Sequence, residues 1–549
     1  MVGSPLGVQD FKIIRENDLY YVDKTKLISN ILTNVSCSQV HLYTRPRRFG
    51  KSVNLSMIDA YFNMEYSGNR WFDGLYVSEH HPDDPHKNSY PVIYLDMREM
   101  GNGTYVDFHG FMIRKISKLY SNFGYLLESE RIEERDKRMM RSIIDLESND
   151  WDYRLSLLNM CGLLKNHHGV NPIILIDEYD NAVNDAVNDD ERRMILDFVG
   201  PFLSSALKAN ENVQFSVITG ILQITKESIF SGLNNLIVDN IFTSNSDELF
   251  GFSEEEVVCI LEDHGRPEKI EEVKAWYDGY RFGDVDIFNP WSIFHYINNR
   301  FEPASYWAGT SGNSIIRDLL NNTDENTFDN LISLSSGGYI EAIVDPAVSF
   351  DDMSRSSGSI YSLLAMSGYL KATKGGLGCY DLSIPNHEMA TVFSTMLSAW
   401  LGEGIPIPLL RLSKALKEND VDAIGTNLYA ILSPTMSLRV LDNEKPYQAF
   451  LAGLLFSVFG NYDVEADYER GEGYFDILLR RIRGTGPHIV IEIKRESEDR
   501  SADSLRALAK SALYQIKERD YTQGLSGRVI AYGIAFHKKT PFIESEEMW

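Results

Sequence analysis

Residues 40–52 read VHLYTRPRRFGKS, and this stretch decides the fold of the first part of the chain. Its apolar beginning, VHLY, predicts a buried β-strand, and the segment NLSMIDAYF after Ser52 predicts a helix. The loop between them is close to the phosphate-loop pattern G-x-x-x-x-G-K-[ST], because Gly50, Lys51 and Ser52 fit, although Arg45 stands at the first glycine. A strand, a tight loop and a helix N-terminus form the arrangement that phosphate binding requires, because backbone N–H groups then face the phosphates.

The three fitting residues each have a chemical part in such a site. Gly50 lets the backbone approach, Lys51 can reach the β- and γ-phosphates, and the Ser52 hydroxyl can bind Mg²⁺, so the expected ligand is ATP with Mg²⁺. The candidate cofactor-binding residues of the loop are Arg47, Arg48, Phe49, Gly50, Lys51 and Ser52. A G-K-S tripeptide is common by chance, so the prediction needs a second motif.

That second motif is the run Ile-Ile-Leu-Ile-Asp-Glu at residues 173–178. Four apolar β-formers predict a buried parallel strand that ends in two carboxylates. Beside a phosphate loop, Asp177 would hold Mg²⁺ through water, and Glu178 would act as a catalytic residue that polarises the attacking water. The alternative is a strand that ends in a solvated acidic turn, since Asp180 continues the acidic run. The order of the two motifs favours the nucleotide site.

Two further features near this motif have alternative interpretations. The run VQFSVITG ends in Thr219, where a RecA-like ATPase places a polar residue that senses the γ-phosphate and so belongs to the cofactor site; a threonine at a strand end is the alternative. Arg192 and Arg193 could act as an arginine finger on a neighbouring copy, but two arginines on an acidic helix are more often surface residues.

The alternation of strand and helix extends over the first 250 residues. Short β-rich runs are each followed by a longer helical pattern, which predicts a parallel α/β sheet with both faces covered. These runs are Val40–Tyr43, Pro91–Leu95, Pro172–Ile176 and Val213–Ile218.

Two further parts of the chain follow. Residues 251–390 lack the alternation and begin with GFSEEEVVCILEDHG, in which Ser253 and Glu256 form a capping-box pattern, so we predict a mainly helical middle domain. Residues 391–549 predict amphipathic helices and then the order helix, strand, strand, helix, strand, which is an α/β unit of its own. The predicted domains are therefore 1–250, 251–390 and 391–549.

A second acidic constellation lies in the last of these domains. Asp476 precedes the apolar run ILL, and Glu492 and Lys494 follow in the strand-like IVIEIK. Glu492 and Lys494 share a face because side chains alternate along a strand, and a hairpin would bring Asp476 beside Glu492. Two carboxylates bind a hard Mg²⁺ ion, with Mn²⁺ as an alternative, and a lysine can orient water or balance charge in a transition state. Gln515, on the predicted downstream helix, could face a phosphodiester as a further catalytic residue.

A simpler interpretation of this constellation is a hairpin with one surface Glu–Lys pair, because E-x-K is a common tripeptide. The upstream aspartate and the downstream glutamine favour the catalytic interpretation. Arginines that could attract phosphate, or could be plain surface residues, flank the constellation at Arg480, Arg481, Arg483 and Arg495.

Composition places limits on the class of protein. The chain has 549 residues, a formal net charge of −26, 43% hydrophobic and 24% charged residues, which is typical of several globular domains. The acidity excludes a protein that coats nucleic acid by bulk charge, but not one with a local basic channel. Four cysteines lie far apart, without a zinc or disulfide pattern. Neither a signal peptide nor a membrane-spanning run is evident, so we expect a soluble, cytoplasmic protein without a membrane partner.

Taken together, these motifs resemble bacterial and archaeal proteins in which an AAA-ATPase-like domain precedes a C-terminal PD-(D/E)XK nuclease domain. The resemblance runs through nearly the whole chain. Its markers include GVQDFKIIRENDLYYVDKT (7–25), YTRPRRFGKSVNLSM (43–57), ILIDEYDNAV (174–183), WYDGYRFG (276–283), GEGYFDILL (471–479) and IVIEIKRE (489–496). That family's phosphate loop has the same R-P-R-R-F-G-K-S form, so Arg45 departs only from the general pattern.

The resemblance implies a P-loop NTPase sheet of the RecA/AAA type, a helical middle or lid domain and a restriction-endonuclease-like α/β domain. It implies that Asp476, Glu492 and Lys494 form a nuclease core, and that this core hydrolyses phosphodiester bonds of nucleic acid, DNA more than RNA, under the control of ATP. Glu444 is the nearest candidate for a further glutamate on the first helix of the nuclease domain. AAA-like modules often form rings, so a homo-oligomer is one expected assembly.

Three alternatives stay open. Asp23 and Lys24 either lie near the nucleotide or pin an N-terminal turn. The whole chain could instead be an ATP-dependent oligomeric switch or nucleic-acid-binding protein with a catalytically silent nuclease fold, or an ATPase remodeller whose C-terminal unit recruits partners. The complete set of Asp476, Glu492 and Lys494 speaks against a silent domain, which has no chemical need for all three.

Overall fold

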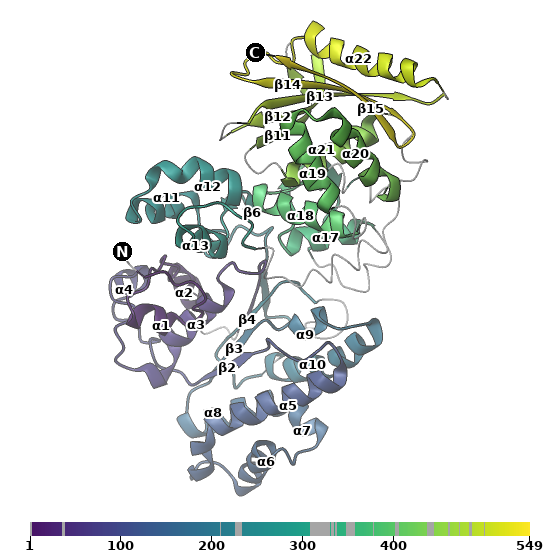
Figure 1. Ribbon diagram of the computed structural model, residues 1–549. Coiled ribbons are helices and arrows are strands. Elements are labelled where there is room, and N and C mark those ends of the chain that lie inside the picture. The colour runs from purple at the N-terminus through teal and green to yellow at the C-terminus, as the bar shows by residue number, and fades with distance from the viewer. Residues whose placement is uncertain are drawn as a thin grey trace. The chain divides into compact units, whose positions relative to one another are not determined.

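The computed structural model describes residues 3–33, 35, 39–208, 210–224, 233–307, 330, 334, 337–346, 357–376, 378–400, 406–435, 444–458, 462–470, 473–482, 486–498 and 500–548 (Figure 1). The chain forms two compact units. The first comprises Met1–Trp307 with Ile343–Thr373, and the second comprises Ala308–Ala342 with Lys374–Trp549. The three predicted domains, with limits at residues 250 and 390, stay a prediction.

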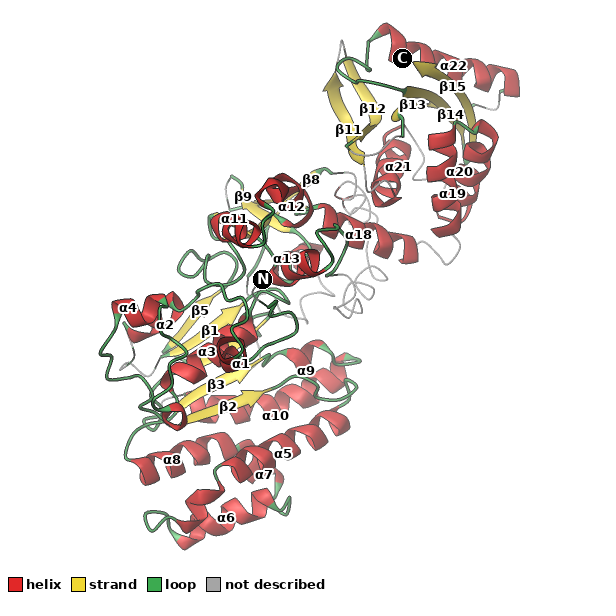
Figure 2. Cartoon of the chain, turned by 60° about the vertical axis from the view of Figure 1, so that its left-hand side comes forward, coloured by secondary structure: helices red, strands yellow, loops and turns green. Residues whose placement is uncertain are grey.

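The first unit is built on a parallel sheet of five strands (Figure 2). Its order is β2-β3-β4-β1-β5, and every neighbouring pair is parallel. The strands are β1 (Val40–Thr44), β2 (Val92–Asp96), β3 (Ile173–Asp177), β4 (Ser216–Gly220) and β5 (Leu236–Asp239). The predicted parallel α/β sheet is confirmed, and β5 is an addition that the sequence patterns did not indicate.

Helices cover both faces of this sheet because its strands are apolar on both sides. On one face Phe108, Met160 and Phe198 join Ile174 in a shared core. On the other face α3 packs against the sheet. The helices around the sheet are α1 (Phe11–Glu16), α2 (Lys26–Leu32), α3 (Lys51–Phe62), α4 (Tyr76–His80), α5 (Tyr105–Asn122), α6 (Glu134–Ile144), α7 (Asp150–Arg154), α8 (Ser156–His168), α9 (Asn181–Asn184) and α10 (Asp189–Leu207).

A smaller group of elements completes the first unit. The predicted capping box is confirmed, because the Glu256 backbone N–H donates to the Ser253 hydroxyl and the Ser253 N–H donates to the Glu256 carboxylate. The elements of this group are α11 (Glu254–Asp263), α12 (Ile270–Tyr277), β6 (Tyr280–Phe282), β7 (Val285–Ile287), α13 (Pro290–Asn298), α17 (Ser357–Met366) and β9 (Lys371–Lys374).

The N-terminal turn is tied to this group by a buried lysine. Lys24 Nζ lies 2.6 Å from the Glu256 carboxylate and donates to the Glu248 carbonyl oxygen at 2.7 Å. Asp23 accepts from the backbone N–H of Thr25 and of Tyr76. Of the two alternatives for Asp23 and Lys24, the structure favours a structural pin over a place at the nucleotide.

Arg45, at the position of the first glycine of the general phosphate loop, has a fully buried side chain. Its Nη2 lies 2.8 Å from the Asp239 carboxylate at the end of β5 and donates to the Ser246 hydroxyl at 3.0 Å. The guanidinium also lies 5.1 Å from the ring centroid of Phe250 and 5.2 Å from that of Phe282. Arginine is therefore used here as a core side chain that fixes the start of the loop to β5 and to β6.

Loss of the Asp239 carboxylate should destabilise the first unit severely. Asp239→Ala leaves the Arg45 cation buried without its counter-ion, and we expect a loss of about 3–5 kcal/mol in the free energy of unfolding, measured by urea denaturation of the full chain. Asp73→Ala is the matched control, because the Asp73–Arg70 pair is largely exposed and should contribute at most about 1 kcal/mol. Equal stability of the two variants would contradict the assigned role of Arg45.

The second unit contains a mixed sheet of five strands in the order β11-β12-β13-β14-β15. β13 and β14 are parallel, and the other neighbours are antiparallel. The strands are β11 (Tyr462–Arg470), β12 (Gly473–Arg481), β13 (His488–Glu496), β14 (Val529–His537) and β15 (Thr540–Met548). The predicted C-terminal α/β architecture is confirmed, with β11 and β15 as additional edge strands.

Helices lie on both faces of this second sheet (Figure 2). Ile491 packs toward α19, α20 and α21, whereas its neighbour Val490 packs toward α22, as the alternation of side chains along a strand requires. The remaining elements of the unit are β8 (Tyr339–Ala342), β10 (Tyr380–Ser383), α18 (His387–Trp400), α19 (Pro406–Glu418), α20 (Val421–Thr435), α21 (Glu444–Val458) and α22 (Ala502–Glu518). None of the helices in the described part of the chain has the length and apolar character to cross a membrane.

Candidate nucleotide and metal sites

Three loops at one edge of the parallel sheet hold non-glycine residues in the left-handed region. Arg48, Glu99 and Glu178 have φ angles of +72°, +55° and +53°, in the loops that follow β1, β2 and β3. This backbone conformation costs of order 1–3 kcal/mol and concentrates at ligand sites. Gly50, with φ +82°, adopts it at the N-terminus of α3 without that cost. The carboxyl ends of β1, β2 and β3 therefore form a candidate binding edge.

Lys51 lies at the centre of this edge with 3% of its side chain exposed. Its Nζ donates to the carbonyl oxygens of Arg45 and Pro46, both at 3.0 Å, and lies 3.6 Å from Oε1 of Glu178. The loop thus curls around the ammonium group, and the Glu178 carboxylate compensates its charge. The structure brings together the two predicted residues Lys51 and Glu178.

Asp177 is fully buried at the end of β3. The Thr219 hydroxyl donates to its Oδ1 at 2.5 Å, while its Oδ2 has no hydrogen-bond partner within the described residues. Burial raises the pKa of Asp177, and the hydrogen bond from Thr219 and the nearby hydroxyl of Ser52 oppose that shift. Thr219 is bonded to Asp177 and Ser52 lies near it, which is the arrangement that the sequence predicts for a magnesium–nucleotide site.

Asp180 shows that the acidic run is not a solvated turn. Its side chain is fully buried, and its Oδ2 accepts from the backbone N–H groups of Ile221 and Leu222, both at 2.8 Å. Burial raises its pKa to about 6. The alternative of a surface acidic turn is wrong, because Asp180 fixes the loop after β4 to the loop after β3.

The loop residues Arg47, Arg48 and Phe49 lie in three different surroundings. Arg47 is 4.0 Å from the Asp185 carboxylate, and the Arg48 guanidinium lies 4.1 Å from the ring centroid of Trp291. The Phe49 side chain is fully buried, so only its backbone is available to a ligand.

An arginine that the motifs did not indicate reaches this edge from β2. Arg98 Nη2 lies 2.6 Å from Asp96 Oδ2 and 3.9 Å from Asp177 Oδ2. By contrast, Arg192 and Arg193 form ion pairs with acids three residues earlier on α10. The only signal for Arg98 was its place three residues beyond the predicted strand Pro91–Leu95.

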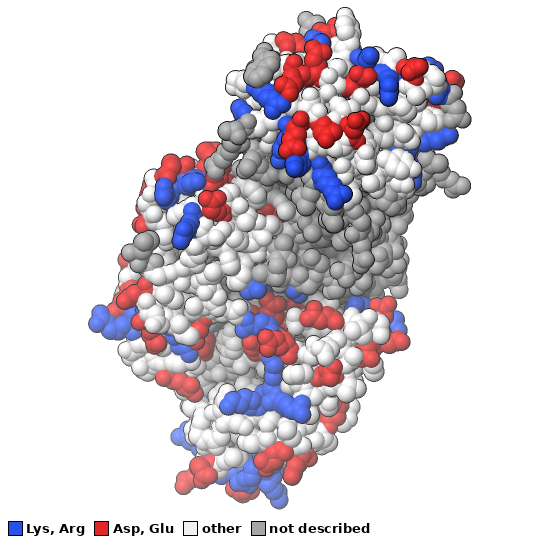
Figure 3. Space-filling model, viewed as in Figure 1, with Lys and Arg blue, Asp and Glu red and all other residues white. Residues whose placement is uncertain are grey.

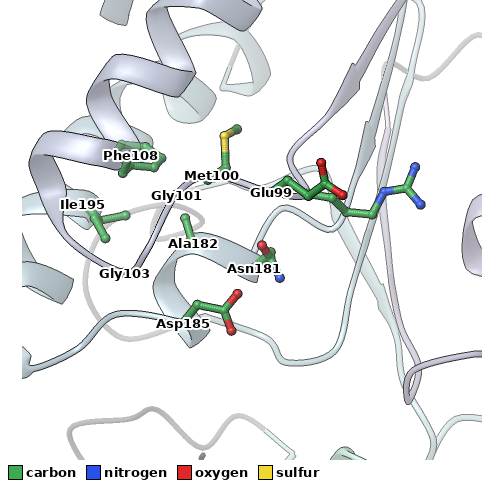
Figure 4. A pocket seen from close by; sticks show the side chains of 10 residues that line it. Glu99, Met100, Gly101, Gly103, Phe108, Asn181, Ala182, Asp185 and Ile195 are labelled. Carbon is green, nitrogen blue, oxygen red and sulfur yellow. The ribbon is translucent and has the colours of Figure 1, made fainter. Parts of the chain in front are cut away.

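A pocket of about 250 Å³ adjoins the edge (Figure 4). Apolar side chains from three segments form one part of its wall, and charged or amide groups form another. The residues are Met100, Phe108 and Ile195 in the apolar part, and Arg98, Asn181 and Asp185 in the polar part. The space beside Arg98 is therefore partly shielded from water.

In the second unit, strand pairing brings the predicted carboxylates together. The antiparallel register of β12 and β13 pairs Ile477 with Ile491, which makes Asp476 and Glu492 the next opposed positions. Asp476 Oδ2 accepts from the backbone N–H of Ile493 at 2.6 Å. The strand pairing therefore places the two predicted acids near each other, as the hairpin interpretation expects.

Glu492 is 2% exposed, on the β13 face that α22 covers. Its Oε1 accepts from Lys494 Nζ at 3.2 Å and from Gln515 Nε2, whereas its Oε2 is buried without a hydrogen-bond partner in the described part of the chain. Burial and the nearby Asp476 raise the pKa of Glu492 to about 7, against the effect of Lys494. The four predicted residues of this constellation lie together.

A glycine on the neighbouring strand explains how Gln515 reaches Glu492. Gly533 of β14 pairs with Glu492, and a Cβ there would lie 2.1 Å from the Ala509 carbonyl oxygen and 2.6 Å from the Leu513 nitrogen. Only glycine allows α22 to approach β14 this closely. No sequence motif marks Gly533, because a glycine inside a strand has no spacing signature of its own.

The donor set of this constellation fits a divalent cation. Two facing carboxylates repel each other unless a cation or a proton lies between them, and the open Oε2 of Glu492 offers a ligand atom. Within the described ranges no group of three or more His, Cys, Asp and Glu is arranged to hold a metal ion, so backbone or water oxygens would complete the coordination. Glu444 begins α21 and accepts from the Arg495 backbone N–H at 3.2 Å, one residue beyond Lys494.

Of the arginines that flank the constellation, Arg480 is held in ion pairs and is therefore less available to bind phosphate. The Arg480 guanidinium is paired with Asp463 and Glu465 of β11, which compensates its charge. Arg483 lies outside the described residues.

Divalent-ion binding to the second unit should depend on pH through Glu492. The folded-state pKa of Glu492 is near 7, above the ordinary value of 4.5. Protonated Glu492 therefore contributes fully to the stability of the fold at pH values below 4.5, and this contribution is lost as the pH rises to about 7. A cation needs the ionised form, so we expect Mn²⁺ to raise the unfolding temperature more at pH 8 than at pH 6. Glu492→Gln should remove the Mn²⁺ effect, whereas Asp177→Asn, measured without nucleotide, should retain it. An unchanged Mn²⁺ effect in Glu492→Gln would contradict the assignment.

Comparisons with known proteins match both regions. Residues 5–230 match a family described as predicted AAA-ATPase, of AAA-ATPase-like type, and residues 442–546 match the PD-(D/E)XK nuclease superfamily. The chain is also 26% identical over 492 residues to the "uncharacterized protein in vnfD 5′ region" of Azotobacter chroococcum mcd 1, and the alignment covers 86% of each chain. The resemblance drawn from the motifs is confirmed, and each matched range contains one of the two candidate sites.

Proposed function

We propose that this chain, in which an AAA-ATPase-like domain precedes a PD-(D/E)XK nuclease domain, is an ATP-regulated, Mg²⁺-dependent nuclease. The observation that carries the proposal is the buried Glu492 carboxylate, with one oxygen bonded by Lys494 and Gln515 and the other without a hydrogen-bond partner in the described ranges. A purely structural core position would be more stable without that charge. Such a carboxylate, with Asp476 beside it, suits a site in which a bound cation joins Lys494 and contacts the open oxygen.

The proposed nuclease chemistry assigns one part to each residue of the constellation. Asp476 and Glu492 would hold Mg²⁺, or Mn²⁺ in its place. The bound ion would neutralise charge on the phosphate and lower the pKa of a water molecule. Lys494, on the same face as Glu492, would position the attacking water or balance the negative charge that develops on the phosphate oxygens. Gln515 would hold Glu492 in the orientation that leaves Oε2 open.

The proposed nucleotide site uses the carboxyl edge of the first sheet. Lys51 would contact the β- and γ-phosphates, which requires its ammonium group to leave the loop carbonyl oxygens that it now contacts. Ser52 and Asp177 would hold the Mg²⁺ of ATP, Glu178 would polarise water, and Thr219 would respond to the γ-phosphate through its bond to Asp177.

Contacts of the phosphate loop support a role of residues 251–390 as a lid that responds to nucleotide. Arg48 stacks on Trp291, Phe49 packs against Tyr280 with 4.9 Å between ring centroids, and the Trp307 indole N–H donates to the Arg47 carbonyl oxygen at 3.4 Å. A change in the loop on nucleotide binding would therefore displace side chains of the lid directly.

We propose DNA rather than RNA as the substrate and the cytoplasm as the location of the protein. We propose a homo-oligomer as its assembly. On the face drawn in Figure 3, blue and red side chains are interspersed rather than gathered into a basic surface. With a net charge of −26, the chain would bind a duplex weakly at physiological salt unless neighbouring copies concentrate their basic groups.

Cleavage assays on single- and double-stranded DNA, with Mg²⁺ or Mn²⁺ and with or without ATP, test this proposal. We expect Glu492→Ala to lower the cleavage rate by about 100-fold or more, because several kcal/mol of transition-state stabilisation are lost. Glu498→Ala is the matched control, since this exposed glutamate lies on the same segment outside the constellation and should leave the rate unchanged. Lys51→Ala should remove the effect of ATP on the rate.

Two results would contradict the proposal. Cleavage that survives Glu492→Ala would place the activity elsewhere or in a contaminant. Absence of cleavage on DNA and RNA with either metal, combined with intact ATP binding, would favour the nucleotide-dependent switch with a silent nuclease fold.

A further inference from the structure

The geometry points to Arg98 as the residue that contacts the terminal phosphate of the bound nucleotide and so lets the protein distinguish a triphosphate from a diphosphate. This inference rests on the proposed nucleotide site and adds to it a specificity-determining side chain. None of the motifs assigns a role to Arg98.

The position of Arg98 follows from the order of the strands. β2 is the direct neighbour of β3, so the residue that follows β2 lies beside the carboxyl end of β3. Arg98 Nη2 is 3.9 Å from Asp177 Oδ2, the oxygen that lacks a hydrogen-bond partner within the described residues. The Thr219 hydroxyl donates to the other oxygen of the same carboxylate at 2.5 Å. A γ-phosphate, bound between Lys51 and the metal that Ser52 and Asp177 would hold, would therefore lie next to this guanidinium.

The guanidinium is held in place before any ligand binds. Its Nε and Nη2 donate to the Asp96 carboxylate at 2.9 Å and 2.6 Å, and its Nη1 donates to Gln9 Oε1. Lys115 Nζ donates to the carbonyl oxygens of both Asp96 and Arg98 at 2.7 Å, which fixes the backbone as well. A guanidinium has five N–H groups, so these bonds leave donors for a phosphate oxygen.

The loop after Arg98 limits how far the side chain can move away. Glu99 is in the left-handed region, and a Cβ on Gly103 would lie 2.2 Å from the Asp185 carbonyl oxygen. The Val187 backbone N–H donates to the Gly103 carbonyl oxygen at 3.0 Å. The loop is therefore packed closely against the segment before α10, and Arg98 remains at the site edge with 34% of its side chain exposed.

The other arginines considered for this role have different surroundings. Arg48 is stacked on Trp291, and Arg47 lies nearest to Asp185. Arg192 and Arg193 are paired on their own helix. Among these arginines, Arg98 is the one that forms an ion pair with Asp177.

The test compares the affinity of the full chain for a β,γ-imido analogue of ATP and for ADP, both with Mg²⁺, by isothermal titration calorimetry. Arg98→Ala should weaken binding of the ATP analogue by about 10-fold to 100-fold and leave ADP affinity within about 3-fold, because only the triphosphate loses a charged hydrogen bond. Arg98→Lys keeps a charge but not the planar fork, so it should show a smaller loss in the same direction. Arg193→Ala, an exposed arginine of the same unit, should change neither affinity.

The following results would overturn the role of Arg98. Equal weakening of the ATP analogue and ADP, or no weakening of either, would overturn the role of Arg98 while leaving the nucleotide site in place. If near-UV circular dichroism shows that Arg98→Ala does not fold, the ratio of the affinities for the ATP analogue and for ADP is measured in Arg98→Lys instead. A ratio equal to that of the wild-type chain overturns the inference. If the wild-type chain binds neither nucleotide, the proposed site and the inference both fall.

Discussion

Each unit of this chain buries one carboxylate away from water, and both candidate sites depend on how that charge is compensated. Asp177 and Glu492 are almost fully buried on sheet strands, and in each case one oxygen is bonded by neighbouring side chains while the other has no hydrogen-bond partner in the described part of the chain. A buried charge in this state is costly unless a positive ligand joins it. The hydroxyl of Thr219 and the amide of Gln515 reduce the free-energy cost of burying these carboxylates, but each bonds to only one of the two oxygens. Each site thus keeps one carboxylate oxygen that a cation could bind.

The phosphate loop is part of the hydrophobic core as much as it is a ligand loop. Arg45 replaces a flexible glycine with a buried ion pair to Asp239, and Phe49 packs among aromatic side chains of the β6–β7 hairpin. Arg48 is stacked on Trp291. A loop anchored in this way does not change conformation alone, because the side chains of Arg45, Arg48 and Phe49 are each seated in another segment. Through these contacts, a change of the loop on nucleotide binding would also move side chains of the elements that follow the sheet.

Sequence patterns predicted the parts that depend on local order along the chain. The phosphate loop and the acidic strand followed from short motifs, and the contact of Asp476 with Glu492 followed from the alternation of side chains in a hairpin. Arg98 was missed because its role depends on which strand lies beside β3, and that order is set by long-range pairing. Gly533 was missed for a similar reason, since its need for space arises only when α22 docks on the sheet. β5 has only four residues, and its apolar run Leu-Ile-Val is shorter than the runs that marked the other strands.

The central claim is that one chain carries two separate cation sites, one that requires nucleotide and one that does not. Counting bound Mn²⁺ by electron paramagnetic resonance, with and without ATP, tests it most directly. The account predicts at least one tightly bound Mn²⁺ per chain without nucleotide and a further ion when ATP is added. Asp476→Asn should remove the nucleotide-independent ion and leave the ATP-dependent one. Failure to bind Mn²⁺ without ATP, or full retention of the nucleotide-independent ion in Asp476→Asn, would contradict the account.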